Sequence, residues 1–399
     1  MVVPLATLRP LRLNLLKPFI LLKIMNLALY FHIPYCKHKC PYCDFNSYNN
    51  GINKDFVTAL KEEIGIKSKN IDQYQIGSVF FGGGTPTTLS SFQITDILNF
   101  CFNKFSIKSD CEVSIEANPG TIDYQYLKLL RNKCFNRLSL GCQSFNDDLL
   151  KKIERIHNCD EIFQSVSAAR KAGFKNISLD LMFGLPGQSF DIWEETLQSA
   201  TQLKPTHLSV YNLTIEKETP FYDQLRKGIL ILPSEGLQLK MYKRAVEYLS
   251  QAGYIHYEIS NFAVKGYECR HNKVYWNNNE YVGFGPGAAS YLNGTRSKNI
   301  LSPEKYIETL LEKKEIPLFE KETLDQKKSM WETLMLGLRM VKGINLSDFE
   351  KRFGKTLDSE FGEKIRKLHN EHFLEYSDKK LKLTRKGILY SNEVFVELI

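Results

Sequence analysis

Residues 36–45 read Cys36-Lys-His-Lys-Cys40-Pro-Tyr-Cys43-Asp-Phe45, and this short loop with its three cysteines decides the fold. It follows an apolar run, residues 27–33, that has the composition of a buried strand. Thiolates are soft ligands that suit zinc or iron–sulfur clusters, and the spacing C-x3-C-x2-C gathers three of them in one place. A four-iron cluster then keeps one iron open to a ligand that is not protein. An open coordination position is typical of catalytic metal sites.

With His32-Ile33-Pro34 ahead of it, the loop resembles the cluster loop of the radical S-adenosylmethionine (SAM) superfamily, and within it the HemN/HemW group. The resemblance implies a 4Fe-4S cluster on Cys36, Cys40 and Cys43, with the amino and carboxylate groups of SAM on the fourth iron. In that superfamily an electron from the cluster can split SAM to a 5'-deoxyadenosyl radical. The alternative is a structural zinc site with His32 or His38 as the fourth ligand. Zinc sites usually contain two ligand pairs, and the sequence has no second pair.

Length and composition predict one large domain and a smaller one. The chain has 399 residues, of which 43% are hydrophobic and 12% aromatic, so it can bury a large core. Nine cysteines is an odd number, and the six outside the loop are scattered without a pairing rhythm. This pattern favours a reducing compartment, and we expect a cytoplasmic protein.

The net charge of +8 is concentrated at the start of the chain. Residues 1–24 carry Arg9, Arg12, Lys17 and Lys23 without an acidic residue, which is half of that charge. The other half of the net charge is spread over the remaining residues, and so mild an excess of basic residues does not indicate a nucleic-acid partner. Prolines interrupt residues 1–24, so we expect a dispensable extension ahead of the first strand and no transmembrane segment.

From residue 25 onward, strand-like runs alternate with amphipathic helical stretches. This βα rhythm predicts parallel strands joined by right-handed crossovers. Six such strands are two short of a closed eight-stranded barrel, in agreement with the partial (β/α)6 TIM-like barrel of α/β class that the resemblance implies. The expected strands are 27–33, 78–81, 112–116, 137–141, 176–182 and 207–211, and the expected helices between them are 55–67, 92–103, 160–172 and 189–202.

The later part of the chain changes pattern. We expect the barrel in residues 25–235, an extension of the barrel in 236–310 and a C-terminal module in 311–399. Helical patterns at 331–339, 346–353 and 361–370 precede a strand pair near 374–384, which predicts a winged-helix-like α+β domain, as found in the HemN/HemW group. Its basic cluster near residue 380 is typical of a solvated wing.

A triple-glycine loop, Phe81-Gly82-Gly83-Gly84-Thr85-Pro86, follows the second strand. Glycines let a backbone approach a ligand closely and adopt positive φ. Three later strand ends deliver the polar residues Glu116, Gln143 and Asp180, which a barrel interior disfavours unless a ligand pairs with them. The resemblance implies SAM binding, with a second SAM site as an option for some of these residues, by Tyr30, Tyr42, Gly83, Gly84, Thr85, Glu116, Gln143, Arg155 and Asp180.

Two details separate the subfamilies. Oxygen-independent coproporphyrinogen III oxidases carry a fourth cysteine two residues after the third, and here that position is Phe45. The stretch Arg270-His271-Asn272-Lys-Val-Tyr275-Trp276, followed by Gly283-Phe-Gly-Pro-Gly-Ala288, is similar to the signature of the heme chaperones of the group. The resemblance implies a heme site at His271, Asn272, Tyr275 and Trp276. Residue types alone favour a buried aromatic cluster with a structural histidine.

The resemblance therefore implies a heme chaperone with a 4Fe-4S cluster and SAM. The implied partners are heme and an acceptor hemoprotein, in the family often a respiratory enzyme at the membrane, and a homodimer is compatible with it. The second hypothesis is an oxygen-independent coproporphyrinogen III oxidase, a radical SAM oxidative decarboxylase, and the third is a radical enzyme with an unrelated substrate. Whether the chain is an enzyme at all stays open at this level, as does the axial ligand of heme.

Overall fold

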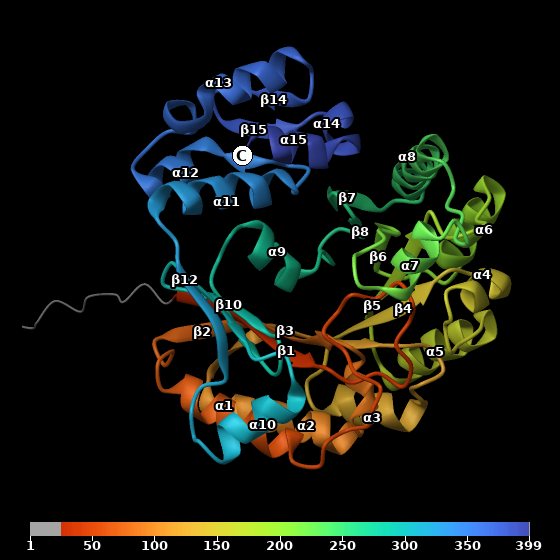
Figure 1. Cartoon of the computed structure of the whole chain (residues 1–399), viewed down its shortest axis with the longest axis vertical. Helices are drawn as coiled ribbons and strands as arrows, with labels where there is room; N and C mark the ends of the chain where they lie inside the picture. Colours follow the sequence, from red (N-terminus) through yellow and green to blue (C-terminus); the bar gives the residue numbers. More distant parts are fainter. Residues whose placement is uncertain (1–24, 399) are drawn as a thin grey trace, which may run out of the picture.

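The computed structural model describes residues 25–398, and its centre is one twelve-stranded sheet (Figure 1). Six neighbouring strands of this sheet are parallel and follow one another in chain order, which confirms the predicted βα rhythm. They are β1 (Met25–Ile33), β2 (Tyr74–Gly83), β3 (Ser106–Ala117), β4 (Arg137–Gln143), β5 (Asn176–Phe183) and β6 (His207–Asn212).

Helices between these strands cover one face of the sheet (Figure 1). Local sequence defines where they begin: Ser90 and Gln93 form a capping box at the second helix, as Asn158 and Glu161 do at the fifth. The layer consists of α1 (Phe56–Ser68), α2 (Ser91–Lys104), α3 (Tyr124–Asn132), α4 (Asp147–Lys152), α5 (Cys159–Ala172), α6 (Phe190–Gln202) and α8 (Glu235–Gln251), and the short helix α7 (Pro220–Arg226) lies apart from it.

The sheet stays open because β1 and β6 are not neighbours, and later strands extend it at both edges. β7 (Ile255–Glu258) and β8 (Asn261–Ala263) join the β6 edge. On the other side, β9 (Tyr281–Phe284) pairs with β1 in parallel. Beyond it lie β10 (Ala289–Leu292), β11 (Thr295–Asn299) and β12 (Leu318–Thr323), with α10 (Pro303–Leu311) before the last strand. β12 therefore belongs to the sheet, although the sequence placed residues 311–399 in the C-terminal module.

The C-terminal module has its own hydrophobic core, centred on residues such as Met330, Phe361 and Leu381. The three expected helices and the strand pair are present, followed by two short helices. The module contains α11 (Gln326–Leu338), β13 (Ile344–Asn345), α12 (Leu346–Phe353), α13 (Leu357–Asn370), β14 (Leu374–Tyr376), β15 (Lys380–Leu383), α14 (Arg385–Leu389) and α15 (Ser391–Glu397). α9 (Arg270–Trp276) lies between this module and the sheet (Figure 1).

Alternation along β1 shows how the core positions the site. Leu29, Phe31 and Ile33 are fully buried in the large core, where the rings of Phe31 and Phe81 stack with centroids 4.7 Å apart. Since successive strand residues point to opposite faces, Tyr30 and His32 point to the barrel interior. Within residues 25–398 no helix combines the length and apolar character needed to cross a bilayer. The extension expected in residues 1–24 lies outside the described residues.

Candidate cluster and cofactor site

The cysteine loop lies at the carboxyl end of β1 and is fixed by backbone hydrogen bonds. Cys36 N donates to Tyr48 O at 2.8 Å, and Tyr48 N donates to Pro34 O at 2.7 Å. Two hydrogen bonds come from the glycine loop after β2: Gly84 N donates to Ile33 O at 2.9 Å, and Thr85 N donates to Tyr35 O at 2.8 Å. The two loops that the sequence singled out are therefore joined backbone to backbone.

The three cysteines line one cavity of about 360 Å³ at this end of the barrel. Cys36 Sγ lies 3.5 Å from Thr85 Oγ1, and Cys40 Sγ lies 3.5 Å from Arg155 Nη1. Burial, with smaller contributions from the neighbouring Cys40 and Cys36, raises the pKa of the Cys43 thiol.

The donor set fits an iron–sulfur cluster better than the zinc alternative. His32 has both ring nitrogens in hydrogen bonds, Nε2 to Asn46 O at 2.8 Å and Nδ1 to the Tyr30 hydroxyl at 3.0 Å. The other candidate ligand, His38, has its Nε2 3.1 Å from Glu154 Oε2. No group of three His, Cys, Asp or Glu side chains between residues 25 and 398 is gathered as the ligands of a single ion would be. Three thiols on one loop at the mouth of one cavity are a donor set that suits three corners of a four-iron cluster.

The glycine loop is shaped by close approach. Gly83 has φ +108°, a left-handed conformation that favours glycine, and a Cβ there would lie 2.7 Å from the His32 ring. A Cβ at Gly84 would lie 2.7 Å from Tyr35 O and 3.0 Å from Cys36 Sγ. The space beside the first cysteine therefore exists because residue 84 has no side chain.

Two carboxylates from neighbouring parts of the barrel face the same cavity. Burial, and then the nearby Asp180, raises the pKa of Glu116 to about 8. Burial also raises the pKa of Asp180, which is close to the hydroxyl of Ser139 at 3.1 Å. Buried carboxyl groups whose pKa values are raised, when they face a cleft, are typical of functional sites.

Arg155 and Gln143 complete this end of the barrel. Arg155 donates from Nη2 to Asn118 Oδ1 at 2.5 Å and to Gly141 O at 2.8 Å. Gln143 has φ +65°, an unusual conformation for a residue other than glycine, and lies where β4 ends. Local strain of this kind concentrates at functional sites.

Most predicted site residues meet at this cavity. Its lining includes Cys36, Cys40, Tyr42, Cys43, Gly83, Gly84, Thr85, Glu116, Gln143, Arg155 and Asp180. The sequence analysis missed Asn118, which bridges Arg155 and Thr85, and the carboxyl end of β6, where Tyr211 and, just after the strand, Leu213 line the cavity. The signal for both was available, because each lies at the carboxyl end of a barrel strand.

The remaining predicted residues lie deeper. A second cavity of about 290 Å³ is lined by Tyr30, His271, Asn272 and Tyr275. Glu116, Asp180 and Tyr211 line both cavities, so the two adjoin. Trp276 lines neither and instead packs against Arg339, whose guanidinium carbon is 4.5 Å from the indole ring centroid.

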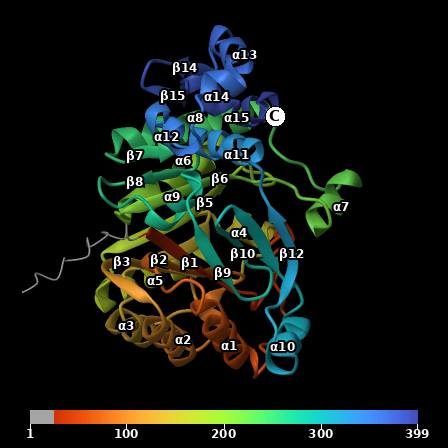
Figure 2. The same cartoon turned by 90° about the vertical axis from the view of Figure 1, so that its left-hand side faces the viewer.

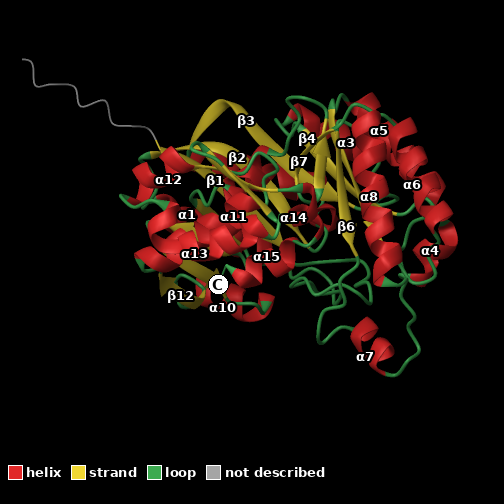
Figure 3. Cartoon of the chain, turned by 90° about the horizontal axis from the view of Figure 1, so that it is seen from above, coloured by secondary structure: helices red, strands yellow, loops and turns green. Residues whose placement is uncertain are grey.

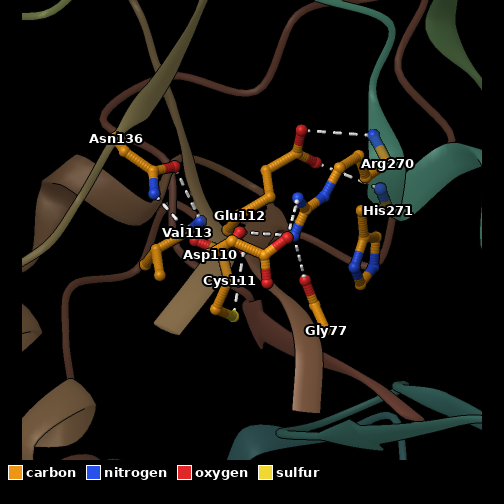
Figure 4. A network of polar contacts seen from close by, with 8 residues as sticks. All are labelled: Gly77, Asp110, Cys111, Glu112, Val113, Asn136, Arg270 and His271. Atoms are coloured by element: carbon orange, nitrogen blue, oxygen red, sulfur yellow. Dashed lines mark hydrogen bonds and ion pairs between the residues drawn. The ribbon is translucent and has the colours of Figure 1, made fainter. Parts of the chain in front are cut away.

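The motif helix α9 is anchored to the middle of β3 (Figure 4). Glu112 accepts from His271 N at 3.0 Å and from Arg270 N at 3.2 Å, so a carboxylate neutralises the first turn of the helix. The Arg270 side chain donates to Gly77 O at 2.9 Å and to Asp110 Oδ2 at 3.1 Å. These contacts fix α9 across the end of the barrel that lies opposite the cysteine loop.

His271 has no ring nitrogen free in this arrangement. It is 1% exposed, with Nδ1 3.0 Å from Ser78 Oγ and Nε2 2.9 Å from the Tyr275 hydroxyl. Burial lowers its pKa to about 3, so the ring is neutral. Heme ligation by His271 stays a prediction, and it requires that one of these two hydrogen bonds be given up.

The same chain resembles known proteins over almost its full length. The model of the Radical SAM superfamily matches residues 30–200, and that of the HemN C-terminal domain matches residues 324–390. The heme chaperone HemW of Bacillus subtilis (strain 168) is 38% identical over 371 residues, which cover 92% of this chain and 98% of that protein. The chain belongs to the HemW family. The heme chaperone HemW of Lactococcus lactis is 36% identical, with 93% of this chain and 97% of that protein covered.

A solved structure supports the HemW fold. Coproporphyrinogen III oxidase (HemN) from Escherichia coli, a radical SAM enzyme, superposes with a TM-score of 0.81 at 24% identity, covering 94% of this chain and 90% of that one. At that identity the likeness concerns the fold alone. A cluster with SAM, when bound in a HemW-family protein, supplies one-electron chemistry, and the residues at the cysteine-loop cavity are those that would hold both.

Proposed function

We propose that this chain is a heme chaperone, which binds heme and passes it to an acceptor hemoprotein while carrying a 4Fe-4S cluster and SAM. The observation that carries the proposal is identity of 36–38%, over nearly the whole of both chains, with two proteins named heme chaperone HemW. Phe45 adds to it. This residue stands where the oxidases that the chain resembles have a fourth cysteine, and its side chain is 61% exposed at the edge of the cluster-side cavity.

In this proposal the cysteine loop holds three irons and the strand ends hold SAM. The carboxyl groups of Glu116 and Asp180 would bind the cationic part of the cofactor, and the Arg155 guanidinium would bind its anionic part. The proposed SAM residues are Tyr30, Tyr42, Gly83, Gly84, Thr85, Glu116, Gln143, Arg155 and Asp180.

The proposed setting is the cytoplasm, with an acceptor such as a respiratory hemoprotein at the membrane. All nine cysteines of the described residues are unpaired, which supports a reducing compartment. A homodimer is proposed as well, and sedimentation of the cluster-loaded protein tests it.

One experiment separates the chaperone from the oxidase. The anaerobically reconstituted protein is offered coproporphyrinogen III with SAM and a reductant in one reaction, and hemin in another. We expect stoichiometric retention of hemin on a desalting column and no protoporphyrinogen IX. Sustained formation of protoporphyrinogen IX would overturn the chaperone and favour the oxidase.

A further inference from the structure

His38 occupies an unusual position in the cysteine loop. It lies between Cys36 and Cys40, lines the cluster-side cavity, and keeps 37% of its side chain exposed. Within residues 25–398 it is the one histidine that lines this cavity. His271, in contrast, is buried at the far end of the barrel with both ring nitrogens engaged. An imidazole that meets solvent beside an open cavity is available to an incoming iron.

Glu154 orients the His38 ring. Its Oε2 lies 3.1 Å from His38 Nε2, and its backbone carbonyl lies 3.9 Å from Cys40 Sγ. Glu154 has φ +53°, a left-handed conformation that is uncommon for residues other than glycine. Metal-ligating histidines almost always donate their second ring nitrogen to a carboxylate or carbonyl, which fixes the tautomer. With Nε2 bonded to Glu154, Nδ1 is the nitrogen left for an iron, since no hydrogen bond within the described chain engages it.

The surroundings of His38 match the chemistry of heme. Lys37 and Lys39 flank it and are exposed, and the Lys39 ammonium donates to Phe45 O at 3.3 Å. Two cationic side chains thus lie beside the ring, where they can attract the propionates of heme. Phe45, which is 61% exposed, offers an aromatic face on the same loop. A porphyrin presents a broad apolar face with two carboxylates at one edge, and this mixture of apolar and cationic groups complements it.

A projecting arm adds apolar surface next to the loop. The arm consists of α7 and the loop after it, and it stands out from the body of the molecule (Figures 2 and 3). Phe221 N donates to Pro41 O at 3.0 Å, which ties the arm to the cysteine loop. Ile229 and Ile231 on the arm are 68% and 77% exposed, although their neighbours Leu230 and Leu232 pack inward. Ile229 and Ile231 thus leave apolar side chains exposed on a segment that is anchored to the cysteine loop.

We propose that heme docks at the rim of the cluster-side cavity, with His38 as its axial ligand and Glu154 as the residue that orients that ligand. This inference rests on the proposed chaperone function and names the place where the cargo is held. Heme then sits beside the cluster loop on the outside of the barrel, and His271 keeps its structural hydrogen bonds.

The test is a hemin titration of cluster-loaded protein without oxygen, followed by absorption and by electron paramagnetic resonance of the ferric heme. His38→Gly should weaken hemin binding roughly tenfold or more and change the heme spectrum, and added imidazole should restore the wild-type spectrum. Glu154→Gln should weaken binding by roughly tenfold, because it removes the carboxylate and leaves the ligand. His372→Gly is the matched control, since this histidine is exposed in the C-terminal module. Iron and sulfide content should be unchanged in all three variants.

The outcomes are distinguishable. If wild-type protein does not retain hemin, the chaperone function fails. If wild-type protein retains hemin and both His38→Gly and Glu154→Gln leave affinity and spectrum unchanged, the site fails and the function stands. A spectrum altered by His271→Gln, with His38→Gly silent, would place the ligand on α9 instead. Should His38→Gly lose its cluster, the Glu154→Gln spectrum decides, because that variant leaves the cysteine loop intact.

Discussion

Arg155 Nη1 lies 3.5 Å from the sulfur of Cys40, so a permanent cation stands beside a thiol that has to be deprotonated to bind iron. The guanidinium is fixed by Asn118 and Gly141 O, at the ends of β3 and β4. Asn118 in turn donates to Thr85 of the glycine loop at 2.9 Å. One chain of hydrogen bonds thus connects three strand ends with the cysteine loop, and the site forms only when the barrel has folded.

The three loop cysteines should be individually essential for the cluster. Replacing Cys36, Cys40 or Cys43 with Ser should reduce iron and sulfide to background after anaerobic reconstitution, because two thiolates cannot hold the cluster against solvent. Cys134→Ser is the control, since this thiol is exposed and distant in sequence from the loop. Full iron content in any single loop variant, or zinc in place of iron in the wild-type protein, would contradict the assignment.

Gly84→Ala should also reduce cluster content, for a steric reason. The added Cβ would lie 2.7 Å from Tyr35 O and 3.0 Å from Cys36 Sγ, and a backbone oxygen cannot yield cheaply. Gly77→Ala is the control, since it makes the same substitution at a position where the added Cβ would have no heavy atom within 4 Å. We expect a markedly lower iron-to-protein ratio for Gly84→Ala, and a wild-type ratio for Gly77→Ala. Equal ratios would show that the glycine loop adjusts freely.

The sequence predicted the parts of this site that depend on short-range pattern. Cys36, Cys40 and Cys43 are neighbours in the chain, and the six barrel strands follow from apolar periodicity and chain order. The surroundings of His271 could not be predicted in this way, because its hydrogen-bond partner Ser78 is 193 positions away in the sequence. β12 was missed because all six of its residues are exposed and its Glu-Lys-Glu stretch has the composition of a loop, a pattern that protects edge strands.

Removing residues 1–24, so that the chain starts at Met25, should leave cluster content and hemin binding unchanged. The segment precedes β1 and is interrupted by Pro4, Pro10 and Pro18. The measurement is a comparison of both chains by iron analysis, hemin titration and urea unfolding. A truncated chain that fails to fold would show that this segment contributes to the structure.

Glu116 should make the protein without cofactor less stable as pH rises. Its pKa is raised from 4.5 to about 8 by burial and by Asp180, so between these values the folded chain binds a proton that the unfolded chain has lost. Its contribution to the free energy of unfolding is therefore fully present below pH 4.5 and lost as pH rises through about 8. The slope from one proton is at most about 1.4 kcal/mol per pH unit.

Glu116→Gln should remove that slope. Urea unfolding across the pH range should show a flatter profile for Glu116→Gln than for the wild type. Glu350→Gln, on the exposed face of α12, should follow the wild type. Parallel wild-type and Glu116→Gln profiles would show that Glu116 is ionised in the folded protein at neutral pH.

His271 should be a stability residue of the barrel whatever its relation to heme. Replacing it with Ala deletes a fully buried ring and leaves the hydroxyls of Ser78 and Tyr275 without their partner. A cavity and two lost hydrogen bonds together cost about 2–5 kcal/mol, which urea unfolding would report as a lower midpoint at an unchanged slope. His372→Asn, at an exposed position with φ +63° that asparagine tolerates, should cost less than about 0.5 kcal/mol. If His271→Ala unfolds at the same urea concentration as the wild type, His271 does not stabilise the barrel. A role for its ring in ligand binding would then be favoured over a structural one.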